Sequence, residues 1–99
     1  MHIISKKRLQ TFWKKHADAK PSLTRWYNIA KKAHWRNLDN VQNDFRSGDM
    51  AGDCTVFNIS GNKYRLITKI YYEQGTILIR FILTHAEYDK GVYKDDCNC

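Results

Sequence analysis

The chain lacks a long apolar segment and a leader pattern, and each absence excludes a class of protein. No apolar run approaches the roughly 20 residues that a membrane-spanning helix requires. The basic residues Lys6, Lys7 and Arg8 follow the first apolar residues at once, which is unlike a signal peptide. We therefore expect a cytoplasmic protein without membrane contact. Its 99 residues suit one domain over residues 1–93, with a flexible tail over 94–99.

Cysteine is also scarce, and its placement argues against a disulfide framework. The chain has three cysteines, Cys54, Cys97 and Cys99, which is an odd number. Cys97 and Cys99 could supply two metal ligands, but a closed zinc site normally needs four, and no second pair exists. We expect free thiols on the tail, no metal site and no cofactor.

Acidic residues are nearly missing from the first third of the chain. Residues 1–36 hold ten Lys or Arg and one acid, Asp18, whereas residues 37–99 hold seven bases and nine acids. The net charge of +7 therefore comes from the first third. Such asymmetry favours a polyanion or an acidic protein as partner, and a solvated helical face is the plain alternative.

Apolar residues at helical spacing predict two amphipathic helices in this basic third. The first covers about residues 5–16, and the second begins near Pro21, which suits a first helical turn. The two would form an αα-hairpin after a short strand at residues 1–4. We interpret Trp13 and Trp26 as core anchors rather than as platforms for stacked bases.

The rest of the chain predicts a sheet. A short third helix is expected near residues 38–45, and a loop rich in Gly and Asp follows it. Three strands with tight turns between them are then expected at residues 54–60, 63–73 and 76–84. The fold class is α+β, in the order β-α-α-(α)-β-β-β, with the helices on one face of an antiparallel sheet.

Alternation of side chains divides this sheet into a core face and a polar face. On the last strand, an unbroken apolar row should meet the helices: Ile77, Ile79, Phe81 and Leu83. Arg65, Lys69 and Arg80 point the other way, and His85 and Tyr88 follow at the exit of the strand. Arginine grips phosphate with paired hydrogen bonds, and histidine exchanges protons near neutral pH. The set suits a phosphodiester substrate, against the alternative of a solvated sheet face.

The segment from Val56 to Asp89 also resembles a known family. The motifs VFNI-x-GNKYRL, YYE and IRF-x-x-THAEYD are similar to those of HigB toxins from bacterial toxin–antitoxin modules, within the RelE-like ribonuclease superfamily. The opening MHIIS, the length and the element order match as well. The resemblance implies a concave α+β domain that cleaves mRNA, usually on the translating ribosome. It also implies a HigA-like helix-turn-helix antitoxin, through which the pair would bind and repress operator DNA.

The resemblance further implies a metal-independent reaction. In RelE-like enzymes the ribose 2′-hydroxyl attacks the adjacent phosphate, which needs proton transfer and cationic stabilisation. Carried over to matching positions, Arg65 and Arg80 would hold the phosphate, and His85 and Tyr88 would transfer protons or stack on a base. The residues expected to bind RNA are basic: Lys6, Lys7, Arg8, Lys14, Lys15, Lys63 and Lys69.

Two other functions stay open at this point. ParE-like toxins of the same superfamily inhibit DNA gyrase without catalysis, and a fold does not fix a function. A plain RNA-binding module would use the αα-hairpin rather than the sheet. The combination of Arg65, Arg80, His85 and Tyr88 favours the nuclease, because neither alternative requires it.

Overall fold

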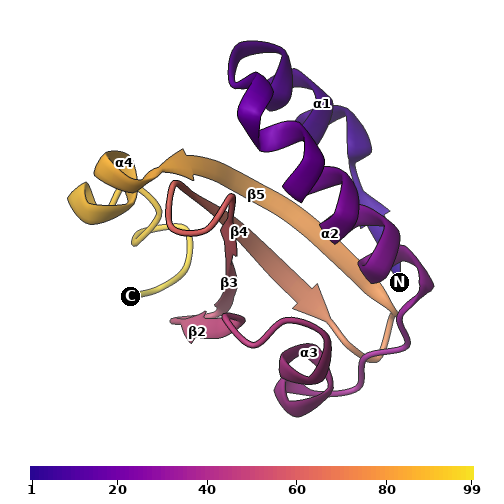
Figure 1. The fold of residues 1–99 in the computed structure, drawn as a ribbon. Coiled ribbons are helices and arrows are strands. Elements are labelled where there is room, and N and C mark those ends of the chain that lie inside the picture. The colour runs from indigo at the N-terminus through magenta and orange to yellow at the C-terminus, as the bar shows by residue number, and fades with distance from the viewer.

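A five-stranded mixed sheet organises the chain, and the computed structural model describes all residues from 1 to 99 (Figure 1). The strands are β1 (His2–Ile4), β2 (Asp49–Ala51), β3 (Cys54–Ile59), β4 (Tyr64–Tyr71) and β5 (Thr76–Thr84). The helices are α1 (Lys6–Lys15), α2 (Lys20–Lys32), α3 (Leu38–Asp44) and α4 (His85–Lys90), and a 3-10 turn η1 spans Ala17–Ala19. The predicted α+β class is confirmed. None of the helices combines the length and the apolar character that crossing a membrane requires.

The strand order is β1-β5-β4-β3-β2, and the first strand lies beside the last. Strand β1 runs parallel to β5, with Ile3 opposite Ile77, whereas all other pairs are antiparallel. The three later strands therefore pair antiparallel as predicted, and the N-terminal strand adds a parallel edge to the sheet. Parallel neighbours need a long crossover connection, and the intervening helices and strands provide it. Strand β2 lies in the segment expected to be a loop and helix α4 follows the last predicted strand, so neither was predicted.

The helices α1 and α2 form the predicted αα-hairpin and cover one face of the sheet. Their buried side chains include Leu9, Leu23 and Trp26, which join Phe57 and Leu66 of the sheet in a core of 13 buried residues. Trp26 is only 1% exposed, so its interpretation as a core anchor is confirmed. Trp13 is partly buried at the edge of the same core.

A β-bulge interrupts the register between β4 and β5. Ile67 pairs with Phe81, but the next residue, Thr68, pairs with Ile79, so that Arg80 is the extra residue. A one-residue shift turns the following side chains to the opposite face. Ile79 accordingly joins the helix-side core, whereas Phe81 packs with the cluster on the other side.

The predicted apolar row is therefore wrong in its second half. Ile77 and Ile79 meet the helices as expected, but Phe81 and Leu83 do not. Alternation along β4 is confirmed, because Tyr64 and Leu66 belong to the helix-side core and Ile67 to the opposite cluster. The alternation rule failed on β5 because a bulge depends on pairing with the partner strand. The residue pattern of β5 alone does not reveal it.

The face away from α1 and α2 has a small core of its own, made of six buried residues: Cys54, Val56, Ile67, Leu83, Tyr93 and Cys97. A disulfide joins Cys54 of β3 to Cys97, which lies 43 positions later in the sequence. The backbone N–H of Asp53 also donates to the Cys97 carbonyl at 2.7 Å. Figure 1 shows this C-terminal segment on the side of the sheet away from α1 and α2.

One expectation about the C-terminus is corrected by this packing. Most of the predicted flexible tail, residues 94–98, is in turns next to the sheet. Cys97 was expected to be a free thiol, but it is fully buried and bonded to Cys54. Only Cys99 is free and exposed. The disulfide could not be predicted from sequence spacing, because the two cysteines are far apart in the chain and only the tertiary fold brings them together.

Candidate active site

The six residues predicted for the sheet surface fall into two groups. Lys63, Arg65, His85 and Tyr88 lie where β4 begins and α4 follows β5, and we call them the exit cluster. Lys69 and Arg80 lie further along the same two strands, and we call them the capped pair. Arg65 pairs with Leu83, three residues beyond Arg80, which is about 10 Å of strand.

The exit cluster is built by the pairing of β4 with β5. Tyr64 is the partner of Thr84, and the backbone N–H of His85 donates to the Lys63 carbonyl at 3.1 Å. The Arg65 guanidinium lies 5.3 Å from the centre of the Tyr88 ring, in a cation–π arrangement. One Arg65 nitrogen donates to the carbonyls of Asn62 and Tyr64, at 2.9 and 3.2 Å. Arg65 forms no salt bridge, so most of its donors stay available.

Helix α4 presents His85 and Tyr88, and a capping box fixes where the helix begins. The Thr84 hydroxyl accepts from the Glu87 N–H at 3.2 Å, and the Glu87 carboxylate accepts from the Thr84 N–H at 2.9 Å. The hydrogen bond from the Thr84 backbone holds the pKa of Glu87 below its usual value. Gly91 ends the helix in the left-handed conformation, at φ 75°.

The His85 imidazole is exposed and oriented by an acid one helical turn away. Its Nδ1 lies 2.9 Å from Asp89 Oδ2, and the two side chains are 52% and 61% exposed. An Nδ1–H that donates to Asp89 leaves Nε2 as the nitrogen that can accept a proton. The site thus places an oriented imidazole, a phenol and an arginine on one end of the sheet.

A neighbouring polar group was missed by sequence reasoning. Asp18 accepts a hydrogen bond from the Tyr64 hydroxyl at 2.7 Å and forms an ion pair with the Lys63 ammonium. The Tyr64 hydroxyl also lies 3.5 Å from Nδ1 of His16. The hydrogen bond from Lys63, followed by that from Tyr64, lowers the pKa of Asp18, and the bond to Asp18 raises the pKa of Tyr64. The available signal was that Asp18 is the single acid among ten basic residues.

The capped pair shares one carboxylate of the C-terminal segment. Asp96 accepts two hydrogen bonds from Arg80, at 2.8 Å from Nε and 2.7 Å from a terminal nitrogen. The Lys69 ammonium lies 3.8 Å from the same carboxylate. The Arg80 hydrogen bond lowers the pKa of Asp96, and the same contact raises the pKa of Arg80. Arg80 thus lies on the same side of the sheet as Arg65, but further along it, and its guanidinium is occupied by an acid.

The five basic residues of α1 that were predicted to bind RNA are all exposed: Lys6, Lys7, Arg8, Lys14 and Lys15. Lys7, Arg8 and Lys15 line a hollow of about 440 Å³ beside β5, with Phe12 and Ile82 as its apolar wall. The Arg8 guanidinium donates to a β5 backbone carbonyl at 3.2 Å. None of the five forms a salt bridge, so their positive charge stays available to a polyanion.

One group of side chains has the residue types of a metal site. Ligand atoms of Cys54, Asp96 and Cys97 all lie within 4.8 Å of one another. Both sulfurs are joined in the disulfide, however, and Asp96 is paired with Arg80. Cysteine binds a metal ion as a free thiolate, so this oxidised form offers a metal only the occupied carboxylate.

Comparison with known proteins identifies the family. Residues 19–91 match the family model described as HigB_toxin, RelE-like toxic component of a toxin-antitoxin system. The chain belongs to the HigB toxin family. The HigB resemblance seen in the sequence motifs is therefore confirmed, and an antitoxin is the partner that family membership implies.

Curated HigB proteins match nearly the whole chain. The mRNA interferase toxin HigB of Escherichia coli K12 is 29% identical over 92 residues, which cover 90% of this chain and 88% of that protein. The mRNA interferase HigB of Escherichia coli O6:H1 is 27% identical over 93 residues, covering 91% and 90%. The HigB family model covers the exit cluster but ends at Gly91, so Asp96 and Cys97 lie beyond it.

Proposed function

We propose that this HigB toxin is an endoribonuclease that cleaves mRNA in the cytoplasm. The relatives that match about nine-tenths of the chain carry the name mRNA interferase. The observation that carries the proposal is the exit cluster. There an arginine without an acidic partner lies 5.3 Å from the Tyr88 ring, next to an exposed His85 that Asp89 orients.

The proposed reaction is transesterification within the RNA. The ribose 2′-oxygen bonds to the adjacent phosphorus, the P–O5′ bond breaks, and a 2′,3′-cyclic phosphate and a 5′-hydroxyl result. His85 and Tyr88 share the two proton transfers, one from the 2′-hydroxyl and one to the 5′-oxygen. Arg65 stabilises the negative charge that builds up on the phosphorane. Side chains meet each of these needs, which supports chemistry without a metal ion.

The basic surfaces outside the exit cluster supply binding rather than chemistry in this proposal. The hollow beside α1 holds cations without acidic partners, which suits the phosphates of mRNA and of the ribosome. Lys63 is paired with Asp18, so it contributes less to RNA binding than the sequence suggested. We further propose a HigA-like helix-turn-helix protein as the antitoxin, with operator DNA bound through that partner.

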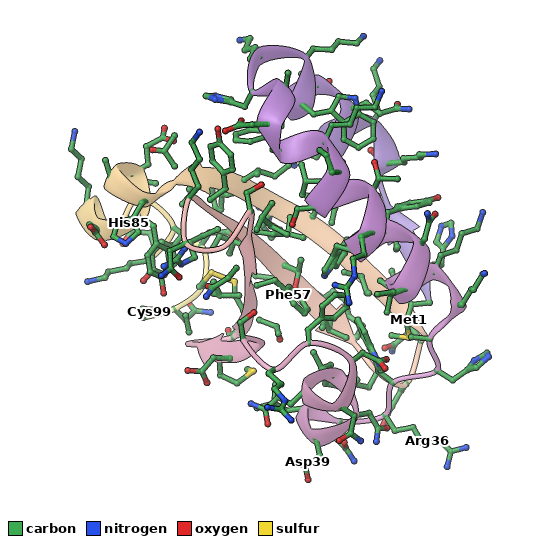
Figure 2. The ribbon with its side chains drawn as sticks, in the orientation of Figure 1. Met1, Arg36, Asp39, Phe57, His85 and Cys99 are labelled. Atoms are coloured by element: carbon green, nitrogen blue, oxygen red, sulfur yellow. A yellow bond between two sulfur atoms is a disulfide. The ribbon has the colours of Figure 1, made fainter.

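The test is cleavage in growing cells. Wild type, Arg65→Ala and His85→Ala are expressed, and mRNA 5′ ends are mapped. Wild type should cut within coding regions, and removing a group that stabilises the transition state should slow cleavage about 100- to 1000-fold. Arg36→Ala is the matched control, because Arg36 is exposed and lies on the opposite side of the molecule from His85 (Figure 2).

Other outcomes would point elsewhere. Growth arrest with intact mRNA and damaged DNA would overturn the nuclease in favour of gyrase inhibition. An Arg65→Ala variant that cleaves at the wild-type rate would overturn the exit cluster as the site, while leaving the nuclease in place.

A further inference from the structure

Residues 92–99, which we call the strap, cover part of the sheet face that carries the predicted cations. They lie outside the HigB family match, which ends at residue 91. Two of their side chains are nevertheless core residues, because Tyr93 is 7% exposed and Cys97 is fully buried. In Figure 2 the disulfide lies close to the labelled Cys99, where the strap meets the sheet. The strap thus lies beyond the family match and packs against the cationic face of the sheet.

The Asp96 carboxylate of the strap marks an anion site. It takes two charge-assisted hydrogen bonds from one edge of Arg80 and lies 3.8 Å from Lys69. Arginine binds carboxylate and phosphate with the same two-pronged geometry. The side chains that hold Asp96 are therefore suited to a phosphodiester, and the two anions cannot occupy the position together.

The strap also reaches the exit cluster. The Tyr93 ring stacks on Tyr88 at 4.8 Å with an angle of 6° between the ring planes, and Tyr88 in turn lies against Arg65. Burial, with help from the Tyr88 hydroxyl, raises the pKa of Tyr93 to about 12. Tyr93 and Cys97 cover Ile67 and Leu83, which separate Arg65 from Arg80 along the sheet. An RNA strand that contacts both cations must displace the strap.

One covalent bond holds the strap in place. The Cys54–Cys97 disulfide joins it to β3, and its remaining links are hydrogen bonds, two ion pairs of Asp96 and the contacts of a six-residue core. Such a small core gives limited stabilisation compared with a domain core. The disulfide is therefore the contact whose loss would change the position of the strap most.

We propose that the strap is an autoinhibitory segment, in which Asp96 occupies an RNA phosphate site at Arg80 and Lys69 until the Cys54–Cys97 disulfide is reduced. A dithiol reductant supplies two electrons and two protons, the S–S bond breaks to two thiols, and the dithiol becomes a disulfide. A reducing cytoplasm then favours the open form, and oxidation closes it. The proposal rests on the proposed nuclease function and adds its regulation.

The first test compares oxidised and dithiothreitol-treated full-length protein. Cleavage is measured by mapping mRNA 5′ ends in a translating extract, and the reduced form should cleave about 10- to 100-fold faster, since the lost contacts include hydrogen bonds between charged groups. The Cys99→Ser variant is the control and should respond to reduction as wild type does. Equal rates from the two wild-type forms would overturn the strap and leave the nuclease in place.

A second test keeps the disulfide and changes one carboxylate. In the oxidised protein, Asp96→Asn should bind a labelled single-stranded RNA about tenfold more tightly, measured by fluorescence anisotropy. Asp95→Asn is the matched control, because Asp95 is exposed and forms no salt bridge. The gain should vanish when Arg80→Ala is added to Asp96→Asn. Equal affinities for the Asp95 and Asp96 variants would overturn the anion site.

A third measurement separates the strap from the nuclease. Amide hydrogen exchange of residues 93–99 should be slow in the oxidised protein and fast after reduction, while the amides of β4 stay protected. Equal exchange of the strap in both forms would overturn its release, whether or not RNA is cut. If neither form cleaves RNA but the exchange and the affinities change as expected, the nuclease fails and the strap stands as a gate on RNA binding.

Discussion

The two faces of the sheet are covered in different ways. Helices α1 and α2 cover one face through a core of 13 buried residues, whereas α4 and the strap cover the other through six. The helix side has no covalent link, and the strap side has the only disulfide. The strap side also carries Arg65, Lys69 and Arg80. The difference teaches that the larger core lies on one side of the sheet and the candidate active site on the other, under the smaller cover that we propose to be removable.

Reduction should expose this difference most strongly. Cutting the Cys54–Cys97 bond, which spans 43 positions, should lower the free energy of unfolding by roughly 4 kcal/mol in the chain-entropy account of disulfides. Urea unfolding with and without dithiothreitol measures the change, and Cys99→Ser should show the same loss. Identical midpoints in the two conditions would mean that the two faces are not held differently.

Adjacent residues on β4 allow a matched comparison of the two cores. Leu66 and Ile67 are both fully buried, but Leu66 faces the helices and Ile67 faces the strap. Leu66→Ala should cost about 3–5 kcal/mol, because the rigid helix side cannot close the cavity. Ile67→Ala should lower the free energy of unfolding by about 2 kcal/mol in the reduced protein, because release of the strap removes part of the packing around Ile67. Urea unfolding under reducing conditions measures both, and a larger loss for Ile67→Ala would reverse the comparison.

Removing the cap of α4 should have a smaller effect that is confined to the strap side. Thr84→Ala deletes the hydroxyl that accepts from the Glu87 N–H and should cost about 1 kcal/mol. Amide exchange within α4 should quicken, while α1 and α2 stay protected. Glu87→Gln keeps a side-chain oxygen for the Thr84 N–H and is the control. Faster exchange in α1 would show that the two faces are coupled.

The smallest expected effect is a dependence on pH at the strap. The pKa of Asp96 is lowered by Arg80, so its ionised form stabilises the folded state above the ordinary pKa of about 4, and that stabilisation is lost as pH falls through the lowered value. The contribution should stay below about 1 kcal/mol, because the pair is partly exposed. Unfolding measured from pH 7 to pH 3 should be less pH-dependent in Asp96→Asn than in wild type. Identical profiles would show that Asp96 does not contribute to the pH dependence of stability.

Local patterns predicted the helix side well and the strap side poorly. The stripes that became α1 and α2, and the alternation that sorted Leu66 from Ile67, depend on periods within one segment. The bulge at Arg80, the disulfide and the strap depend on partners far away in the sequence. The same holds at the candidate site, where the motifs predicted a role for residues such as Arg65 and Tyr88. The ion pair of Asp18 with Lys63 was not predicted, because its partners are 45 positions apart in the sequence.

The position of β5 in the sheet has a consequence for when the toxin can exist during its own synthesis. Its neighbours are β1, from the start of the chain, and β4, and its residues Ile77 and Ile79 complete the core beneath α1 and α2. A nascent chain that stops before Thr76 lacks two of the 13 core residues and the strand that pairs with both β1 and β4. Long-range pairing of this kind delays folding until late in synthesis. Partly made or truncated chains should therefore be harmless, and toxicity should begin only with a nearly finished polypeptide.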